Sequence, residues 1–130
     1  MQHLTVAIVG CGNIAGGFDT GGAPGKLPLT HAGAYARDGR FRIAACVDPD
    51  EGRREQFMVT WKITKGFARV EQLRGSIEIP DIVSICSPTS CHAGDIETAV
   101  RLSPKLIFCE KPVAPTLAGS EKVLAQCLDA

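Results

Sequence analysis

Residues 4–15, with the sequence LTVAIVGCGNIA, decide the fold of this chain. Residues 4–9 form a short run of apolar and β-branched residues, which predicts a buried strand that ends at Gly10. Gly10, Gly12 and Ala15 then have the spacing G-x-G-x-x-G/A, which is typical of a dinucleotide-binding turn that opens a helix. Gly10 would make the tight turn, and Gly12 would let a pyrophosphate approach the backbone. The N–H groups of Asn13 and Ile14 would then bind the phosphates, although an ordinary strand-to-helix turn is the alternative.

Outward from this turn, short apolar runs alternate with longer helical stretches. Further strands are predicted over residues 41–47, 82–86 and 106–109, with a weaker one near 63–68, and helices over 31–37, 50–59, 90–102 and 116–128. This alternation predicts a single α/β domain of the Rossmann type, with a doubly wound parallel sheet covered on both faces. Residues 16–30 are too rich in glycine and proline for a helix, so we expect them to form an inserted loop.

Length and charge exclude several classes of protein. A chain of 130 residues corresponds to about one domain, and its 14 basic residues balance its 14 acidic ones. A net charge of zero argues against nucleic acid or an acidic membrane surface as a partner. No apolar run approaches the roughly 18 residues of a membrane span. The N-terminus has no basic leader or signal-peptide core, so we expect a cytoplasmic protein.

The six cysteines predict reduced thiols in the core. None of them forms a C-x-x-C pair, and Cys46, Cys86 and Cys109 each lie at the end of an apolar run, where a small buried residue fits. A zinc site would need clustered ligands at closer spacing, so no metal is expected.

Asp48 stands at the end of the second predicted strand. In this fold, an acid at that position accepts hydrogen bonds from the adenosine ribose hydroxyls and repels a 2′-phosphate, so it favours NAD over NADP. The usual spacing from the glycines is about twenty residues, and the insertion accounts for the longer spacing here. Asp48 could instead cap the helix that follows Pro49, and Arg53 and Arg54 could favour a phosphate.

Two more segments place polar residues after a strand. These are DIVSICSPTSCH at residues 81–92 and LIFCEKP at residues 106–112. Together with the glycine turn, they make residues 6–124 resemble the glucose–fructose oxidoreductase, inositol dehydrogenase and rhizopine catabolism family, called Gfo/Idh/MocA. The Glu-Lys-Pro of residues 110–112 is the most specific mark, especially after the Pro-Thr-Ser-x-His of residues 88–92. His31-Ala32 also resembles the histidine-alanine of the family's first helix.

The resemblance implies that Lys111 reaches both the nicotinamide ribose and the substrate hydroxyl. A lysine beside a reacting alcohol lowers the cost of the developing alkoxide and can join a proton relay. Glu110 matches the acid near the nicotinamide ribose, and the bond before Pro112 is often cis in this family. The alternative for Lys111 is a solvated surface lysine.

The resemblance also implies that the end of the strand predicted over residues 82–86 contacts the cofactor. Ser87 and Thr89 lie where that strand end would meet the dinucleotide, and His92 lies at the start of the next helix. A histidine that only hydrogen-bonds the loop is the alternative for His92.

As a whole, the resemblance implies an oxidoreductase that transfers a hydride between a nicotinamide and a secondary alcohol or ketone of a sugar, polyol or related metabolite. The family carries a second α/β domain that supplies an aspartate, a histidine and most of the substrate pocket. The resemblance is also compatible with a full-length protein that forms a homo-oligomer. Because the chain ends at Ala130, we expect residues 1–130 to be the dinucleotide-binding half, inactive on its own. The alternative function is a non-catalytic NAD(H)-binding sensor or regulatory module, which would not need Lys111.

Overall fold

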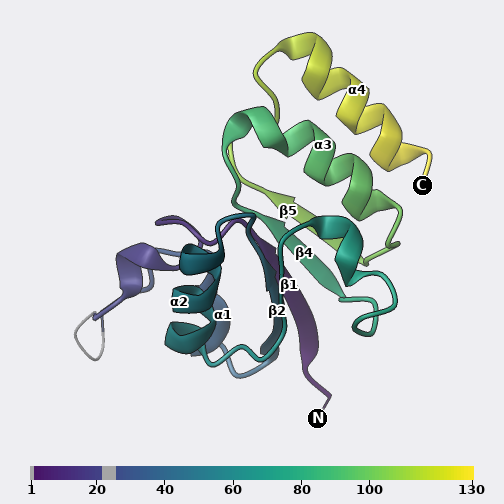
Figure 1. The fold of residues 1–130 in the computed structure, drawn as a ribbon. Coiled ribbons are helices and arrows are strands. Elements are labelled where there is room, and N and C mark those ends of the chain that lie inside the picture. Colours follow the sequence, from purple (N-terminus) through teal and green to yellow (C-terminus); the bar gives the residue numbers. More distant parts are fainter. Residues whose placement is uncertain (1, 22–25) are drawn as a thin grey trace.

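A computed structural model describes residues 2–21 and 26–130, and in these it shows a five-stranded parallel sheet with helices on both faces (Figure 1). The sheet order is β3-β2-β1-β4-β5, so the strand order reverses between β1 and β4. This arrangement confirms the predicted doubly wound α/β fold. In open sheets of this kind, ligands bind beyond the carboxyl ends of the strands at such a reversal. The strands are β1 Leu4–Val9, β2 Phe41–Val47, β3 Gly66–Phe67, β4 Ile82–Ile85 and β5 Leu106–Cys109.

The helices lie in two layers on opposite faces of the sheet. Figure 1 shows α1 and α2 on one face and α3 and α4 on the other. Thr30, Asp50 and Thr116 begin three of the helices, because each side chain accepts a backbone N–H three residues ahead. The helices are α1 His31–Arg37, α2 Glu51–Trp61, α3 Thr89–Val100 and α4 Leu117–Leu128, with 3-10 turns η1 Gly17–Asp19 and η2 Val70–Leu73.

The core consists of two apolar layers that share the central strands. Val6 and Ile8 of β1 pack in the layer beneath α1 and α2, whereas Ala7 and Val9 pack in the layer beneath α3. All four are nearly or fully buried. Successive side chains of a strand point to opposite faces, so an apolar run without alternation serves both layers.

The expectation that the sheet is covered on both faces is wrong for its edge strand. The strand β5 is covered on one face only: Ile107 packs against the core, but Leu106 and Phe108 are 52% and 51% exposed. The reason is its place at the edge of the sheet. In α4, which lies beside α3 (Figure 1), Val123 is buried, whereas Leu117, Leu124 and Cys127 are exposed.

The expected helix directly after the glycine turn is also wrong. Residues 12–16 make a single turn, in which Gly16 N–H donates to the Gly12 carbonyl over 3.2 Å, and the chain then enters η1. Glycines at positions 16 and 17 disfavour a longer helix. The first α-helix begins only at His31, after the insertion.

The base of the insertion is fastened by hydrogen bonds. The Asp19 carboxylate accepts the N–H groups of Leu29 and Thr30, and Ala32 N–H donates to the Ala15 carbonyl over 2.8 Å. The predicted loop over 16–30 is therefore tied back to the glycine turn at both ends. Residues 22–25 of that prediction lie outside the described residues. Within residues 2–21 and 26–130, no helix is long and apolar enough to cross a membrane.

Candidate nucleotide-binding site

Gly10 sits where three strand ends converge. Its φ is +87°, and a Cβ at this position would lie 2.6 Å from the Ser87 nitrogen. Its own N–H donates to the Val47 carbonyl over 2.7 Å. Both the left-handed backbone and the close approach require glycine, so Gly10 fixes the turn against β2 and β4.

Gly12, by contrast, has open space around its α-carbon. A Cβ added there would meet nothing within 4 Å, so the folded chain leaves the space above this residue open. The N–H groups of Gly12, Asn13 and Ile14 donate to no other described residue. Open space beside unpaired backbone donors suits an anion such as a pyrophosphate, so the observed turn fits the predicted dinucleotide.

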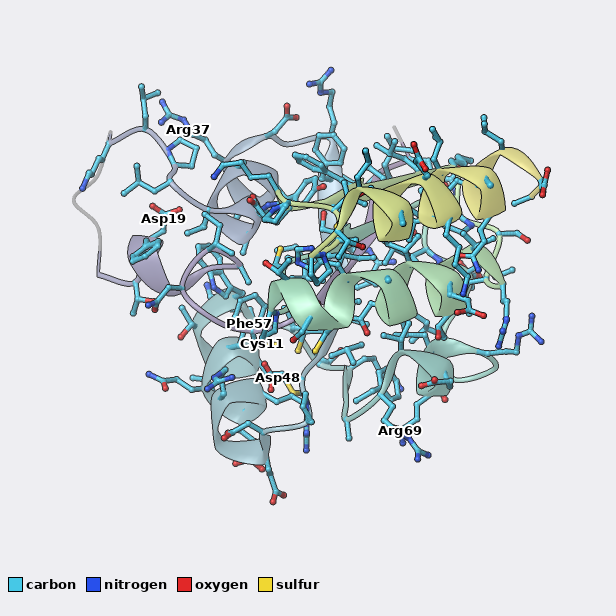
Figure 2. All side chains as sticks on the ribbon, turned by 90° about the horizontal axis from the view of Figure 1, so that it is seen from above. Cys11, Asp19, Arg37, Asp48, Phe57 and Arg69 are labelled. Carbon is cyan, nitrogen blue, oxygen red and sulfur yellow. The ribbon has the colours of Figure 1, made fainter. Side chains whose placement is uncertain are left out.

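Asp48 is joined to this turn. Its carboxylate accepts the N–H of Cys11 and the N–H of Asp50, each over 2.9 Å, and it is 4% exposed. Figure 2 shows Cys11 and Asp48 next to each other. A carboxylate has about four lone-pair sites, so it can still accept a ribose hydroxyl. The alternative role as a helix cap falls to Asp50, whose side chain accepts the Arg53 N–H over 2.8 Å.

The two arginines of α2 differ in their freedom. Arg54 donates to the Asp48 carbonyl over 2.7 Å and is thus part of the framework. The Arg53 side chain is 56% exposed, and its Nη1 lies 3.7 Å from the Asp48 carboxylate. Of these two arginines, Arg53 is therefore the one that a ligand could contact.

Two pockets flank the glycine turn. The larger, of about 670 Å³, lies at the carboxyl ends of β1, β2 and β4, and its lining includes Gly10, Asp48, Arg53, Arg69 and Ser87. The smaller, of about 310 Å³, lies between the turn, η1 and α2, and its lining includes Cys11, Gly12, Arg53, Phe57 and Trp61. Figure 2 shows Cys11 close to Phe57. The larger pocket is at the strand reversal, where the fold predicts the nucleotide.

His92 lies beneath the site rather than on its surface. It is 1% exposed, with Nε2 2.7 Å from the Ser87 carbonyl and Nδ1 2.7 Å from the Pro112 carbonyl. Neither ring nitrogen remains free for a cofactor, which matches the alternative in which His92 bonds only to loops. Ser87 and Thr89 are half-buried, and Ser87 Oγ donates to the Asp95 carboxylate over 2.5 Å. Burial raises the pKa of Asp95.

Glu110 and Lys111 follow β5 at the same edge of the sheet. Glu110 Oε1 lies 2.8 Å from His31 Nε2, and this hydrogen bond lowers the pKa of Glu110. Lys111 is exposed, and its bond to Pro112 is cis, as the resemblance implied. The partnership of His31 with Glu110 was missed in the sequence, where only the family pattern marked His31. His31 is 7% exposed, and its Nδ1 contacts no partner among the described residues.

The prediction that all cysteines are core thiols is wrong in part. Cys11, Cys46 and Cys86 are buried, Cys109 is half-buried, and Cys91 and Cys127 are exposed. The exposed pair lies on helices rather than at strand ends, where no apolar run marked them. The hydrogen bond with Cys46 and burial raise the pKa of Cys11, and burial raises that of Cys86 to about 12. Across residues 2–21 and 26–130, no group of three or more His, Cys, Asp or Glu could hold a metal ion.

Comparison with known proteins adds a family and a fold. Residues 4–129 match the model of a family described as "Oxidoreductase family, NAD-binding Rossmann fold", GFO_IDH_MocA. The uncharacterized oxidoreductase YrbE of Bacillus subtilis (strain 168) is 30% identical over 124 residues, which cover 95% of this chain and 32% of that protein.

Solved structures share the fold at lower identity. An oxidoreductase from Agrobacterium radiobacter, in complex with NAD+, L-tartaric acid and magnesium, is 22% identical with a TM-score of 0.80, covering 98% of this chain and 33% of that one. The scyllo-inositol dehydrogenase of Lactobacillus casei, with NAD(H) and scyllo-inositol, is 20% identical with a TM-score of 0.76, covering 98% and 34%. The WlbA dehydrogenase of Bordetella pertussis, with NADH and UDP-GlcNAcA, is 16% identical with a TM-score of 0.82, covering 98% and 35%. This chain thus spans about a third of the length of the proteins that it matches.

Proposed function

Because this chain belongs to the Gfo/Idh/MocA oxidoreductase family with its NAD-binding Rossmann fold, we propose that it holds NAD(H) for hydride transfer to or from a secondary alcohol or ketone. The substrate class that we propose is a sugar, polyol or related metabolite. The observation that carries the proposal is the open space at the Gly12 backbone. Gly12 lies at the carboxyl ends of the strands, where Asp48, Glu110 and Lys111 also lie.

The adenosine half of the dinucleotide would lie in the larger pocket. In this proposal the N–H groups of Gly12, Asn13 and Ile14 bind the pyrophosphate, and Asp48 accepts the adenosine ribose hydroxyls. The carboxylate of Asp48 favours NAD, because a 2′-phosphate there would face a negative charge. Ser87 and Thr89 would line the strand end between the two halves of the cofactor.

The reacting half would lie toward Lys111. When bound, the nicotinamide supplies the hydride chemistry. Lys111 would hold the nicotinamide ribose and the substrate hydroxyl, and its positive charge would stabilise negative charge that develops on the substrate oxygen. Glu110, held by His31, would contact the same ribose.

The rest of the substrate pocket would come from a second domain. Support for this is the length of the relatives, about three times that of residues 1–130. We further propose a cytoplasmic protein that can assemble as a homo-oligomer in its full length. The net charge of zero over the 130 residues supports a small-molecule partner rather than nucleic acid.

The test compares two ligands that share the adenosine half. ADP keeps the adenosine and pyrophosphate groups, whereas NADH adds the nicotinamide riboside. Calorimetry should show that Lys111→Met weakens NADH binding while ADP binding is unchanged. Lys122→Met, on the exposed side of α4, should change neither. An equal loss of both ligands, or no loss of NADH binding, would contradict the placement of the nicotinamide beside Lys111.

A further inference from the structure

His92 is a buried histidine whose two ring nitrogens both meet acceptors. Nε2 lies 2.7 Å from the backbone carbonyl oxygen of Ser87, and Nδ1 lies 2.7 Å from that of Pro112. A carbonyl oxygen cannot donate a hydrogen bond, so each nitrogen must carry a proton for both bonds to form. A neutral imidazole carries only one such proton.

We propose that His92 is an imidazolium cation that clamps the loop after β4 to the loop after β5. In the neutral ring, one nitrogen lone pair would face a carbonyl lone pair at 2.7 Å in a site that water does not reach, since His92 is 1% exposed. Two charge-assisted hydrogen bonds replace that repulsion when the ring is protonated.

A buried cation needs a compensating charge. Asp95 follows on the same helix, and the charge of His92 acts on its carboxyl group and lowers its pKa, against the larger effect of burial. Asp95 also accepts the hydroxyl of Ser87 over 2.5 Å, so one loop residue is held by both members of the pair. Further ionisable groups lie on the elements around this pair: Glu71 on η2, Cys91 and Glu97 on α3, Glu121, Lys122 and Cys127 on α4, Cys109 on β5, and Glu110 and Lys111 in the loop after β5.

The clamp fixes the backbone on either side of Lys111. Pro112 is held through its carbonyl by His92, and Glu110 N–H donates to the Ile85 carbonyl over 3.0 Å. The exposed lysine is thus anchored between two bonded neighbours, which makes His92 a positioning residue for it. This positioning role rests on the proposed function, whereas the charge state of His92 does not.

The charge state is tested by NMR on the 130-residue chain labelled with ¹⁵N. Two-bond proton–nitrogen spectra separate protonated from bare imidazole nitrogens, and the chain has three histidines to assign. Both nitrogens of His92 should carry a proton near neutral pH, because each faces a carbonyl acceptor. Exposed His3 serves as the internal reference for the assignment of the ring nitrogens. A bare nitrogen on His92 near neutral pH, with the fold intact, would overturn the proposal.

The positioning role is tested by ligand binding. His92→Gln can reach one carbonyl at most, so it should weaken NADH binding about tenfold or more and leave ADP binding unchanged. Ser90→Ala, on the exposed first turn of the same helix, is the control and should change neither. Equal losses of both ligands, or an unchanged NADH affinity, would refute the positioning role. If the glutamine variant does not fold, the NMR result on the unmodified chain still decides the clamp. A wild-type chain that binds neither ligand would refute the proposed function but not the charge state.

Discussion

Cys11 donates its backbone N–H to the Asp48 carboxylate over 2.9 Å, across 37 residues of sequence. The bond joins the glycine turn to the end of β2, so the backbone that we propose binds the phosphates and the acid that we propose binds the ribose are held together. The charge of Asp48 is therefore held at a fixed place in the nucleotide pocket, close to where the 2′-position of the adenosine ribose would lie.

This fixed charge predicts a preference for NADH over NADPH. Fluorescence titration should give at least about a tenfold difference in affinity, which is only about 1.4 kcal/mol and within the cost of placing like charges together. Asp48→Asn should reduce the ratio. Asp50→Asn is the matched control, because it removes a neighbouring charge and keeps the cap of α2. Equal or reversed affinities in the unmodified chain would instead assign Arg53 as a phosphate ligand.

The two glycines of the turn should respond oppositely to substitution. Gly12→Val should unfold at nearly the same denaturant concentration as the unmodified chain, because its side chain enters open space, but NADH binding should be lost. Gly10→Ala should lower the free energy of unfolding by about 1–3 kcal/mol, since its Cβ would press on the Ser87 backbone. A Gly12 variant that binds NADH normally would show that the pyrophosphate does not use this turn.

Thiol reactivity should divide the six cysteines into classes. Mass spectrometry of the unreduced chain should find six free thiols, and a thiol reagent should modify exposed Cys91 and Cys127 first. Cys86 should react slowly near neutral pH, because burial raises its pKa to about 12 and the thiolate is the reactive form. Denaturant should equalise the rates. A native disulfide, or fast labelling of Cys86, would be incompatible with this description.

The sequence was sufficient for the strands and the glycine turn, because local patterns determine them. The apolar runs at 4–9 and 41–47 coincide with β1 and β2, and Gly10 and Gly12 lie where the motif places them. It was insufficient wherever a partner lies far along the chain. His31 meets Glu110 across 79 residues, and no local signal indicates that pair. The exposure of Phe108 likewise depends on β5 being the sheet edge.

Asp81 should make the fold sensitive to acid. Its carboxylate binds Lys105 over 2.5 Å and accepts the Thr5 N–H over 2.8 Å, linking the starts of β1, β4 and β5. The bond to Lys105 is the main cause that lowers the pKa of Asp81 from 3.8 to about 2. A lowered pKa in the folded state means stability that is present above pH 3.8 and lost as the pH falls toward 2.

Asp81→Asn should therefore have a lower free energy of unfolding than the unmodified chain at pH 5. This gap between the two free energies should narrow as the pH falls from roughly 4 to 2. Denaturant unfolding followed by circular dichroism measures this gap at each pH. Glu121→Gln, an exposed change on α4, should leave a constant small difference. A gap for Asp81→Asn that stays the same down to pH 2 would mean that its bonds to Thr5 and Lys105 do not depend on charge.

Residues 1–130 by themselves should bind NADH without turning over substrate. Gly12, Asp48 and Lys111 all lie on this domain, so the phosphates and the adenosine keep their contacts. The binding should be weaker than in a protein with a second domain, because one side of the nicotinamide would face water.

Turnover has stricter requirements than binding. Holding two reactants close together in a reactive orientation lowers the barrier by about 7–11 kcal/mol. Acid–base groups raise the rate by a further factor of about 10²–10⁴. A domain that binds the dinucleotide but cannot hold an alcohol against it loses most of the first contribution, even with Lys111 in place. Absorbance assays with NAD and a panel of sugars and polyols should therefore show no NADH formation, while calorimetry on the same sample detects NADH binding. Sustained reduction of NAD by residues 1–130 would show that the substrate pocket is complete within this domain, and the proposed second domain would then be unnecessary.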